Sequence, residues 1–427
     1  MKKIIVLAYQ ISPIRGSEYS VAWNYVSEMS KDNELVVFYG ASGDHMGDLE
    51  LPKEALVKIP DSNFRLIGIK PNIFARLINL LNKSGLFTFS FYVAYRIWQW
   101  QVYNRVNLLI KNEQFDIMHF LNPIGYREPG YLWKIDLPYI WGPISGISNR
   151  PIQLIKKLTI IEKLFFIFRN MINTLQFKYN IRLKKAIQRT DLLLTATTEN
   201  QKLIEEYYHK QSIYLPENAI INSSIINPLR TINLKQNDII KILWIGRIDA
   251  NKSLIILIEA LSRINLGNYH LHVVGDGQKK NAMQKMSEKL QLQNMITWHG
   301  QIPRTDVFNI LKSSHLHIIT SLGEGNPTTI WEAMSCGIPT ISLNHCGMKD
   351  VICEKCGLKI DIVSYDQVVD DLSKALLDLL NNPEKINLLS HGVNNCIDNF
   401  TWEKRRNLFN QFYNIAIENW KMKKVLV

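Results

Sequence analysis

Short apolar runs alternate with longer amphipathic stretches along the whole chain, and loops rich in glycine, proline or polar residues separate them. Apolar runs of about four to eight residues are typical of buried strands, whereas a 3.6-residue apolar period indicates helices. In the N-terminal half this pattern predicts strands at residues 4–9, 35–39, 117–121, 139–141 and 192–196, a helix at 19–29 and a long helical region at about 72–112.

The C-terminal half alternates more regularly. Strands are predicted at residues 241–245, 269–274, 295–298, 316–320 and 340–343, and helices at 253–264, 278–290, 306–312 and 327–335, with a long final helix at 402–422. Such alternation predicts an α/β fold of two Rossmann-like, doubly wound domains that bind ligands at the carboxyl ends of their strands. A polar stretch at 218–237 marks the junction. The expected domains are 1–220, 221–400 and a helix at 401–427 that packs back on the N-terminal domain.

Composition agrees with a folded two-domain protein. The 427 residues are 46% hydrophobic and 21% charged, which is ordinary for globular domains. The opening MKKIIVLAY is too short for a signal peptide, and no apolar run is long enough to span a bilayer. Five cysteines argue against a disulfide framework and favour the cytoplasm. Cys353 and Cys356 form one C-x-x-C without a second pair, so two thiols in a surface turn are favoured over a metal or redox site.

The net charge of +12 is concentrated in one segment. Residues 151–190 hold nine basic side chains and one acid, interleaved with apolar ones as in an amphipathic helix. This pattern suits peripheral binding to an anionic membrane, at the inner face of the cytoplasmic membrane. A solvated helix face is an equally good interpretation, and nucleic acid is disfavoured because no recognition motif is present. The expected membrane-facing residues are Lys156, Lys157, Lys184 and Lys185.

The most informative motif runs from Glu324 to Glu332 and continues to Pro339. It predicts a strand end, a tight loop and a helix with Asn326 as N-cap and Pro327 in the first turn. The backbone N–H groups of Thr328 and Thr329 would then face an anion such as phosphate. Glu324 and Glu332 supply carboxylates that accept hydrogen bonds from sugar hydroxyls.

These residues resemble glycosyltransferase family four, whose members have the GT-B fold of two Rossmann-like domains facing each other across a cleft and generally retain anomeric configuration. Two glutamates separated by seven residues in an E-G-x-P…E-A-M-x-x-G-x-P context are the family's mark. The resemblance implies that Glu324, assisted by the backbone of Gly325 and Asn326, contacts the donor sugar. It also implies that Glu332 holds the ribose.

Further segments match the same family in order and spacing. Gly246-Arg247 followed by Lys252 resembles the segment that places two cations on the donor diphosphate. Gly275 lies in a turn like the family's G-x-G, and the segment carrying Gly300 and Ile302 resembles the one that lines the nucleotide base. In the N-terminal half the resemblance places Gly16 near the donor phosphate, although Gly-Ser replaces the commoner glycine pair, and His119 of D-x-x-H beside the reacting sugar.

Together these features predict a retaining, hexosyl-type glycosyltransferase that moves a sugar from a nucleotide donor to a glycan or lipid-linked acceptor in bacterial surface-polysaccharide or lipopolysaccharide synthesis. No D-x-D triplet occurs, so no metal or other cofactor is expected. Two alternatives stay open: a sugar-nucleotide epimerase of the same architecture, and a non-catalytic binding or scaffold protein of this fold at the membrane.

Overall fold

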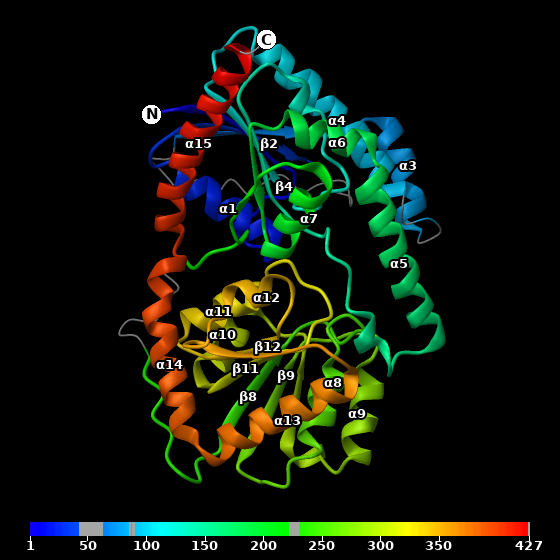
Figure 1. Cartoon of the computed structure of the whole chain (residues 1–427), viewed down its shortest axis with the longest axis vertical. Helices are drawn as coiled ribbons and strands as arrows, with labels where there is room; N and C mark the ends of the chain where they lie inside the picture. The colour runs from blue at the N-terminus through cyan, green and yellow to red at the C-terminus, as the bar shows by residue number, and fades with distance from the viewer. Residues whose placement is uncertain (42–62, 85–86, 88–89, 222–229, 426–427) are drawn as a thin grey trace. The chain divides into compact units, whose positions relative to one another are not determined.

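The computed structural model describes residues 1–41, 63–84, 87, 90–221 and 230–425. The chain forms two compact units (Figure 1). The first unit comprises Met1–Ile147, Leu175–Ala219 and Trp402–Val427, and the second comprises Ser148–Thr174 and Ile220–Thr401. Each unit has its own parallel sheet with helices packed on it, as the alternating pattern predicted.

The described strands of the first unit form a seven-stranded sheet in the order β3-β2-β1-β4-β5-β6-β7, with every pair parallel. All residues of β4 and β5 are buried and most of them are apolar, as is typical of strands inside a parallel sheet. The strands are β1 (Lys3–Ala8), β2 (Glu34–Gly40), β3 (Phe64–Ile69), β4 (Ile117–Asn122), β5 (Tyr139–Ile144), β6 (Leu192–Thr195) and β7 (Ile213–Tyr214). The helices assigned to this unit are α1 (Glu18–Met29), α3 (Ile73–Lys83), α4 (Ser90–Leu109), α6 (Ile181–Arg189), α7 (Thr198–Tyr208) and α15 (Trp402–Val425).

The described strands of the second unit form a six-stranded parallel sheet in the order β10-β9-β8-β11-β12-β13. This order reverses between β8 and β11, and in sheets of this kind ligands bind where the carboxyl ends of two such strands diverge. The strands are β8 (Ile240–Ile245), β9 (Tyr269–Val274), β10 (Ile296–Gly300), β11 (Leu316–Ile319), β12 (Thr340–Leu343) and β13 (Gly357–Ile360). The helices are α8 (Leu254–Leu261), α9 (Lys280–Lys289), α10 (Arg304–Ser313), α11 (Thr328–Ser335), α12 (Cys346–Val351), α13 (Tyr365–Asn381) and α14 (Pro383–Ile397).

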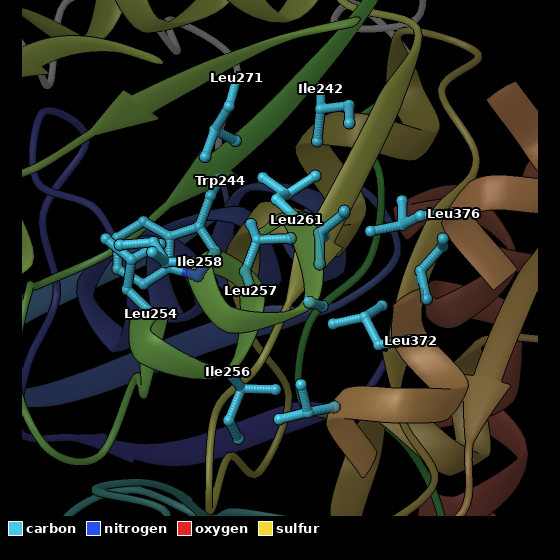
Figure 2. Close-up of a cluster of buried hydrophobic side chains, with 14 of the residues drawn as sticks. Ile242, Trp244, Leu254, Ile256, Leu257, Ile258, Leu261, Leu271, Leu372 and Leu376 are labelled. Atoms are coloured by element: carbon cyan, nitrogen blue, oxygen red, sulfur yellow. The ribbon is translucent and has the colours of Figure 1, made fainter. Parts of the chain in front are cut away.

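The core of the second unit lies between its sheet and the helices α8 and α13. Figure 2 shows Trp244 of β8 and Leu271 of β9 beside side chains of α8, with Leu372 and Leu376 of α13 on the far side of that helix. The Trp244 indole N–H donates to the Thr320 hydroxyl at 3.1 Å, so this core side chain also anchors the loop after β11. Burying one such side chain stabilises the unit by about 1.5–3 kcal/mol.

The expected domain boundaries miss one excursion of the chain, in which residues 148–174 leave the first unit and join the second. Residues 148–174 belong to the second unit, not to the N-terminal domain as expected, because Leu154, Ile155, Leu158 and Phe166 are buried in its core. They lie in and around a short 3₁₀ turn (Ile152–Ile155) and the first part of α5 (Ile160–Tyr179), the helix that crosses from one unit to the other along the chain.

The structure also bears on the long helical region and the final helix that the sequence predicts. The expected region at 72–112 divides into α3 and α4, with Asn72 capping α3 by accepting the Ala75 N–H; residues 85–86 and 88–89 of that region lie outside the described residues. The C-terminal helix α15 belongs to the first unit and packs against α1, where Phe409 contacts Tyr25. Among the described residues, none of the helices is both long and apolar enough to cross a membrane.

Candidate donor site

The centre of the candidate site is the loop between β11 and α11 in the second unit. The helix starts at Thr328 with Pro327 as its N-cap, so the prediction that Asn326 caps it is wrong by one residue. The buried Asn326 instead turns inward, and its side-chain oxygen accepts the Trp331 indole N–H. The N–H groups of Thr328 and Thr329 still lie in the first turn, where the helix dipole favours an anion.

Glu324 and Lys252 meet across the point where β8 and β11 diverge. The Lys252 Nζ lies 2.6 Å from a Glu324 carboxylate oxygen, and both side chains are largely shielded from solvent. Gly246 lies beside them, where a Cβ would contact the Lys252 stem at an ordinary van der Waals distance of 3.4 Å. The Thr320 hydroxyl donates to the Lys252 carbonyl at 2.9 Å, so the core fixes the backbone under this lysine.

The loop after β8 is fixed by Asp249. Its carboxylate accepts the backbone N–H groups of Asn251 and Lys252, each at 2.9 Å, and lies 2.6 Å from the Arg247 guanidinium. Asn251 joins this loop to the one after β11, since its carbonyl accepts the Leu322 N–H at 2.7 Å. The 76% exposed Arg247 side chain remains accessible to a ligand.

Glu332 lies in α11 and pairs with Arg304 at the start of α10. The distance from the guanidinium nitrogen to the carboxylate oxygen is 2.8 Å. Burial raises the pKa of Glu332, and the charge and hydrogen bond of Arg304 oppose that shift. Sequence reasoning did not identify Arg304, because the position pairs with Glu332 only in three dimensions.

The glycine turns line the ends of the neighbouring strands. Gly275 has a φ of +129°, and a Cβ there would lie 1.9 Å from the Gly246 carbonyl oxygen, so the two strand ends approach too closely for any side chain. Its N–H donates to the Gly300 carbonyl at 2.8 Å. Ile302 is half-buried against the small core beneath α10 and α11. The structure thus brings the predicted glycines together at one edge of the sheet.

A pocket of about 450 Å³ opens beside Arg247 in the same unit. It includes Arg150 and Arg169 from the 148–174 excursion, together with Asn251. Arg150 stacks on Phe166, 4.9 Å from the ring centre, and its stem lies so close to Gly323 that a Cβ there would be 3.1 Å away. Sequence reasoning missed both arginines because no local pattern indicates that this excursion leaves the N-terminal domain.

In the first unit, the loop between β1 and α1 carries the exposed Gly16. The next residue, Ser17, has a φ of +58° and a ψ of −140°, a conformation that glycine adopts much more easily. This agrees with a family pattern that has glycine here. Glu18 follows at the start of α1; burial raises its pKa to about 7, while the Ile124 N–H, 3.3 Å away, opposes the shift. The sequence analysis did not single out this carboxyl, although it stands where β1 and β4 diverge.

His119 lies in the core of the first unit. Its side chain is fully buried within β4; Nε2 donates to the Gly142 carbonyl at 2.7 Å, and Nδ1 lies 2.9 Å from the Tyr25 hydroxyl and 3.2 Å from that of Tyr413. Burial lowers the pKa of this imidazole to about 4. Both ring nitrogens are thus engaged in the core, and the place of His119 beside the reacting sugar stays a prediction.

The expected membrane-facing lysines fall into two groups. Lys156 pairs with Asp366, and Lys157 lies 3.3 Å from Glu259, so these two do not supply the net positive surface that was predicted. Acids distant in sequence provide the counter-charges, which the local charge count could not reveal. Lys184 and Lys185 are exposed on α6.

Comparisons with known proteins bear on the same residues. A family model described as "Glycosyl transferases group 1" matches residues 226–390. An uncharacterised glycosyltransferase of Methanocaldococcus jannaschii is 29% identical over 189 residues, which are 41% of this chain and 46% of that protein. A lipopolysaccharide 1,6-galactosyltransferase of Salmonella typhimurium is 34% identical over 116 residues, 26% of this chain and 32% of that protein. The chain thus spans less than half the length of these relatives.

Solved structures resemble the whole chain in fold. A lipopolysaccharide outer core galactosyltransferase in its apo form aligns with a TM-score of 0.60 at 18% identity, covering 99% of each chain. A glycosyltransferase of Rickettsia africae aligns with a TM-score of 0.64 at 14% identity, covering 98% of this chain and 99% of the other. The fold is therefore GT-B, as predicted. The family match at residues 226–390 confirms the resemblance to glycosyltransferase family four, and this part of the chain is similar to the group 1 glycosyltransferases.

Proposed function

We propose that this protein transfers a hexosyl group from a nucleoside diphosphate sugar to an acceptor hydroxyl, with retention of configuration. One observation carries the proposal. Lys252, Glu324 and the N-terminus of α11 converge where β8 and β11 diverge, beside a pocket that Arg247 lines. Cations, a helix N-terminus and a hydroxyl-binding carboxylate are the groups that a sugar diphosphate requires.

The residues divide the donor between them. Arg247 and Lys252 neutralise the diphosphate, so the bond from the anomeric carbon to the phosphate oxygen can break without a metal ion. Glu324 accepts hydrogen bonds from sugar hydroxyls, with the backbone of Gly325 and Asn326 beside it, and Glu332 accepts those of the ribose. The acceptor oxygen forms the new bond to the anomeric carbon, and its proton passes to the departing diphosphate.

Two ion pairs at the site support the assignment of Arg247 and Lys252 to the diphosphate and of Glu324 to the sugar. Lys252 is held by Glu324 and Arg247 by Asp249, so neither cation needs a bound phosphate to be stable. An arriving diphosphate competes with these carboxylates for the cations. Glu324 then loses its lysine partner and becomes available to hydroxyl groups of the same ligand.

The test is a thermal-shift screen of the full chain against nucleoside diphosphates and nucleotide sugars. A ligand at a hundred times its Kd adds about 2.7 kcal/mol of stability. Glu332→Ala should weaken nucleotide binding by about 10- to 100-fold, because a charged hydrogen bond is worth about 1.5–3 kcal/mol. Glu324→Ala should mainly reduce transfer and leave diphosphate affinity within a few-fold. Glu288→Ala, at an exposed glutamate of α9, is the matched control.

Two results would contradict the proposal. If neither glutamate variant changed binding or turnover in a folded protein, the donor-site assignment would be wrong. If the sugar nucleotide were converted to its epimer without release of a nucleoside diphosphate, the epimerase alternative would be correct. Binding of the nucleotide without either reaction, across a range of acceptors, would indicate a binding protein.

We also propose that the acceptor is lipid-linked and that the protein binds the surface of an anionic membrane. Helix α3 supports this better than the basic segment on which the sequence prediction rested. Ile73 and Phe74 are each 67% exposed, and Leu77, Leu80 and Leu81 follow on the same face at helical spacing. Arg76 and Lys83 lie on the same helix, and basic residues that flank an apolar face attract anionic headgroups.

Vesicle sedimentation distinguishes the contribution of the apolar face of α3 from that of the lysines on α6. Phe74→Ser with Leu77→Ser should abolish binding to anionic vesicles, whereas Lys184→Gln with Lys185→Gln should reduce it only at low salt, because screening already weakens exposed charges at 0.15 M. Val363→Ser, at an exposed apolar residue of the second unit, is the control. Unchanged binding by the α3 variant would overturn the assignment of α3.

A further inference from the structure

Two cysteines of one turn and a third that is distant in sequence meet at one corner of the second unit. Cys353 and Cys356 occupy the turn between α12 and β13, and Cys396 lies in α14, forty residues further along. The Cys353 sulfur is 3.2 Å from that of Cys356 and 3.6 Å from that of Cys396. All three sulfurs lie within 4.8 Å of one another, which the spacing of the C-x-x-C alone could not reveal.

The turn itself is arranged around its sulfur atoms. The Cys356 sulfur accepts the Cys353 N–H at 3.2 Å. Backbone donors directed at sulfur stabilise a negatively charged thiolate, which is the form that binds metals.

The cluster is anchored to the core but remains accessible. Cys356 is buried and packs with Ile352, Val393 and Ile397 in a small core that also contains Trp331 of α11. Cys353 and Cys396 are half-buried, so an ion can reach them from solvent. An ion held here would join the α12–β13 turn to α14.

We propose that Cys353, Cys356 and Cys396 bind one thiophilic closed-shell cation, Zn²⁺ or Cu⁺. Metal–sulfur bonds of about 2.3 Å in tetrahedral geometry place the sulfurs about 3.8 Å apart, close to the separations in this cluster. Thiolates select these soft ions over Mg²⁺ or Ca²⁺. Each thiol that binds releases its proton to solvent. Among the described residues no fourth Cys, His, Asp or Glu completes the cluster, so a fourth position is left to solvent for Zn²⁺, while three thiolates suffice for Cu⁺.

This site is independent of the proposed transfer activity, and metal binding tests it directly. The full chain, reduced and freed of metal, is titrated anaerobically with Zn²⁺ against a chromogenic zinc chelator and with Cu⁺ against a copper(I) chelator. We expect one equivalent of one of these ions per chain, bound at least tenfold more tightly than by Cys396→Ser or by Cys353→Ser. The same ion should raise the Tm of the native chain and not that of Cys396→Ser.

The control is Cys336→Ser, because Cys336 is a buried cysteine outside the cluster. It should keep the full equivalent, provided that circular dichroism shows both serine variants to be folded. Binding lost equally in Cys336→Ser, or no stoichiometric uptake of either ion by the native chain, would overturn the proposal. So would a count of three rather than five free thiols in chain purified without oxidant, since two of the cysteines would then form a disulfide.

Discussion

His119 should act as a structural residue whose buried imidazole makes the first unit sensitive to acid. In the neutral ring, Nε2–H donates to the Gly142 carbonyl and Nδ1 accepts from the hydroxyl of Tyr25 or Tyr413. A second proton would sit on Nδ1, the nitrogen that now accepts from these hydroxyls. It would also place a positive charge in the core. The pKa is accordingly lowered by burial from 6.5 to about 4.

The direction and size of the effect follow from linkage. The folded state binds fewer protons than the unfolded state between these two pKa values, so this stability is fully present above pH 6.5 and is lost as the pH falls toward 4. At pH 5 the binding polynomials of the unfolded and folded imidazole differ by roughly 30-fold, which corresponds to a loss of about 2 kcal/mol. That is a large fraction of the stability of an ordinary domain.

Hydrogen exchange at pH 7 and pH 5, followed by mass spectrometry and corrected for the intrinsic rate, reports each unit separately. We expect peptides from β1 and β4 to lose about 2 kcal/mol less protection on acidification in His119→Gln than in the native chain. The comparison between two pH values cancels the cost of the substitution itself. His317→Gln, at a fully buried histidine of β11, should have the same effect in the second unit alone, and His391→Gln, at an exposed site, in neither.

Catalysis supplies the opposing result. If His119 contacted the reacting sugar, His119→Gln would lower kcat at pH 7 by orders of magnitude while the protein remained folded. The structural role would be refuted if His119→Gln lost turnover in this way and its protection in β1 and β4 had the same pH dependence as in the native chain. Near-native turnover of the folded variant would support it.

Three further predictions follow from the site. Transfer should persist in excess EDTA and should not depend on added Mg²⁺ or Mn²⁺, as chelation assays would show, because cations of the chain and the α11 N-terminus replace a phosphate-bound metal. Gly275→Ala should destabilise the second unit by several kcal/mol or abolish folding, measured by urea denaturation, because the Cβ would collide with the Gly246 carbonyl. Ser17→Gly should raise the stability of the first unit by about 1 kcal/mol, measured in the same way, because Ser17 occupies a glycine conformation.

The sequence predicted best where one physical rule dominates. The strands β1, β4, β8 and β9 are mostly apolar and lie inside their parallel sheets, so hydrophobicity indicates their positions even where a lysine or histidine interrupts the run. The strand β3 was missed, since its residues are half-buried or exposed and an arginine and a glycine interrupt its apolar run. The strand order then places Lys252 and Glu324 at the same edge, although nothing local in the sequence states that they touch.

Failures of the sequence analysis arose where a distant contact outweighs the local pattern. Asn326 has the preferred chemistry of an N-cap, but the indole of Trp331 binds its side chain and moves the cap to Pro327. The motif that ends at His119 gave no sign that tyrosines from α1 and α15 enclose its ring. The C-x-x-C showed two thiols, and the third comes from α14.

The charged groups of the candidate donor site are a further case in which contacts that only the structure reveals bear on function. Motif spacing identified Arg247, Lys252, Glu324 and Glu332 as a set that would meet a ligand, but each is engaged with an oppositely charged neighbour. A cation already paired gains less from a phosphate than an unpaired one, because the ligand must replace an existing partner. In return, each of these cations and carboxylates has a neighbour of opposite charge before a ligand binds. In the proposed function the Lys252–Glu324 pair joins a phosphate-binding group to a sugar-binding group, so the diphosphate and the sugar of one donor would separate it together, which would favour the intact nucleotide sugar over either half.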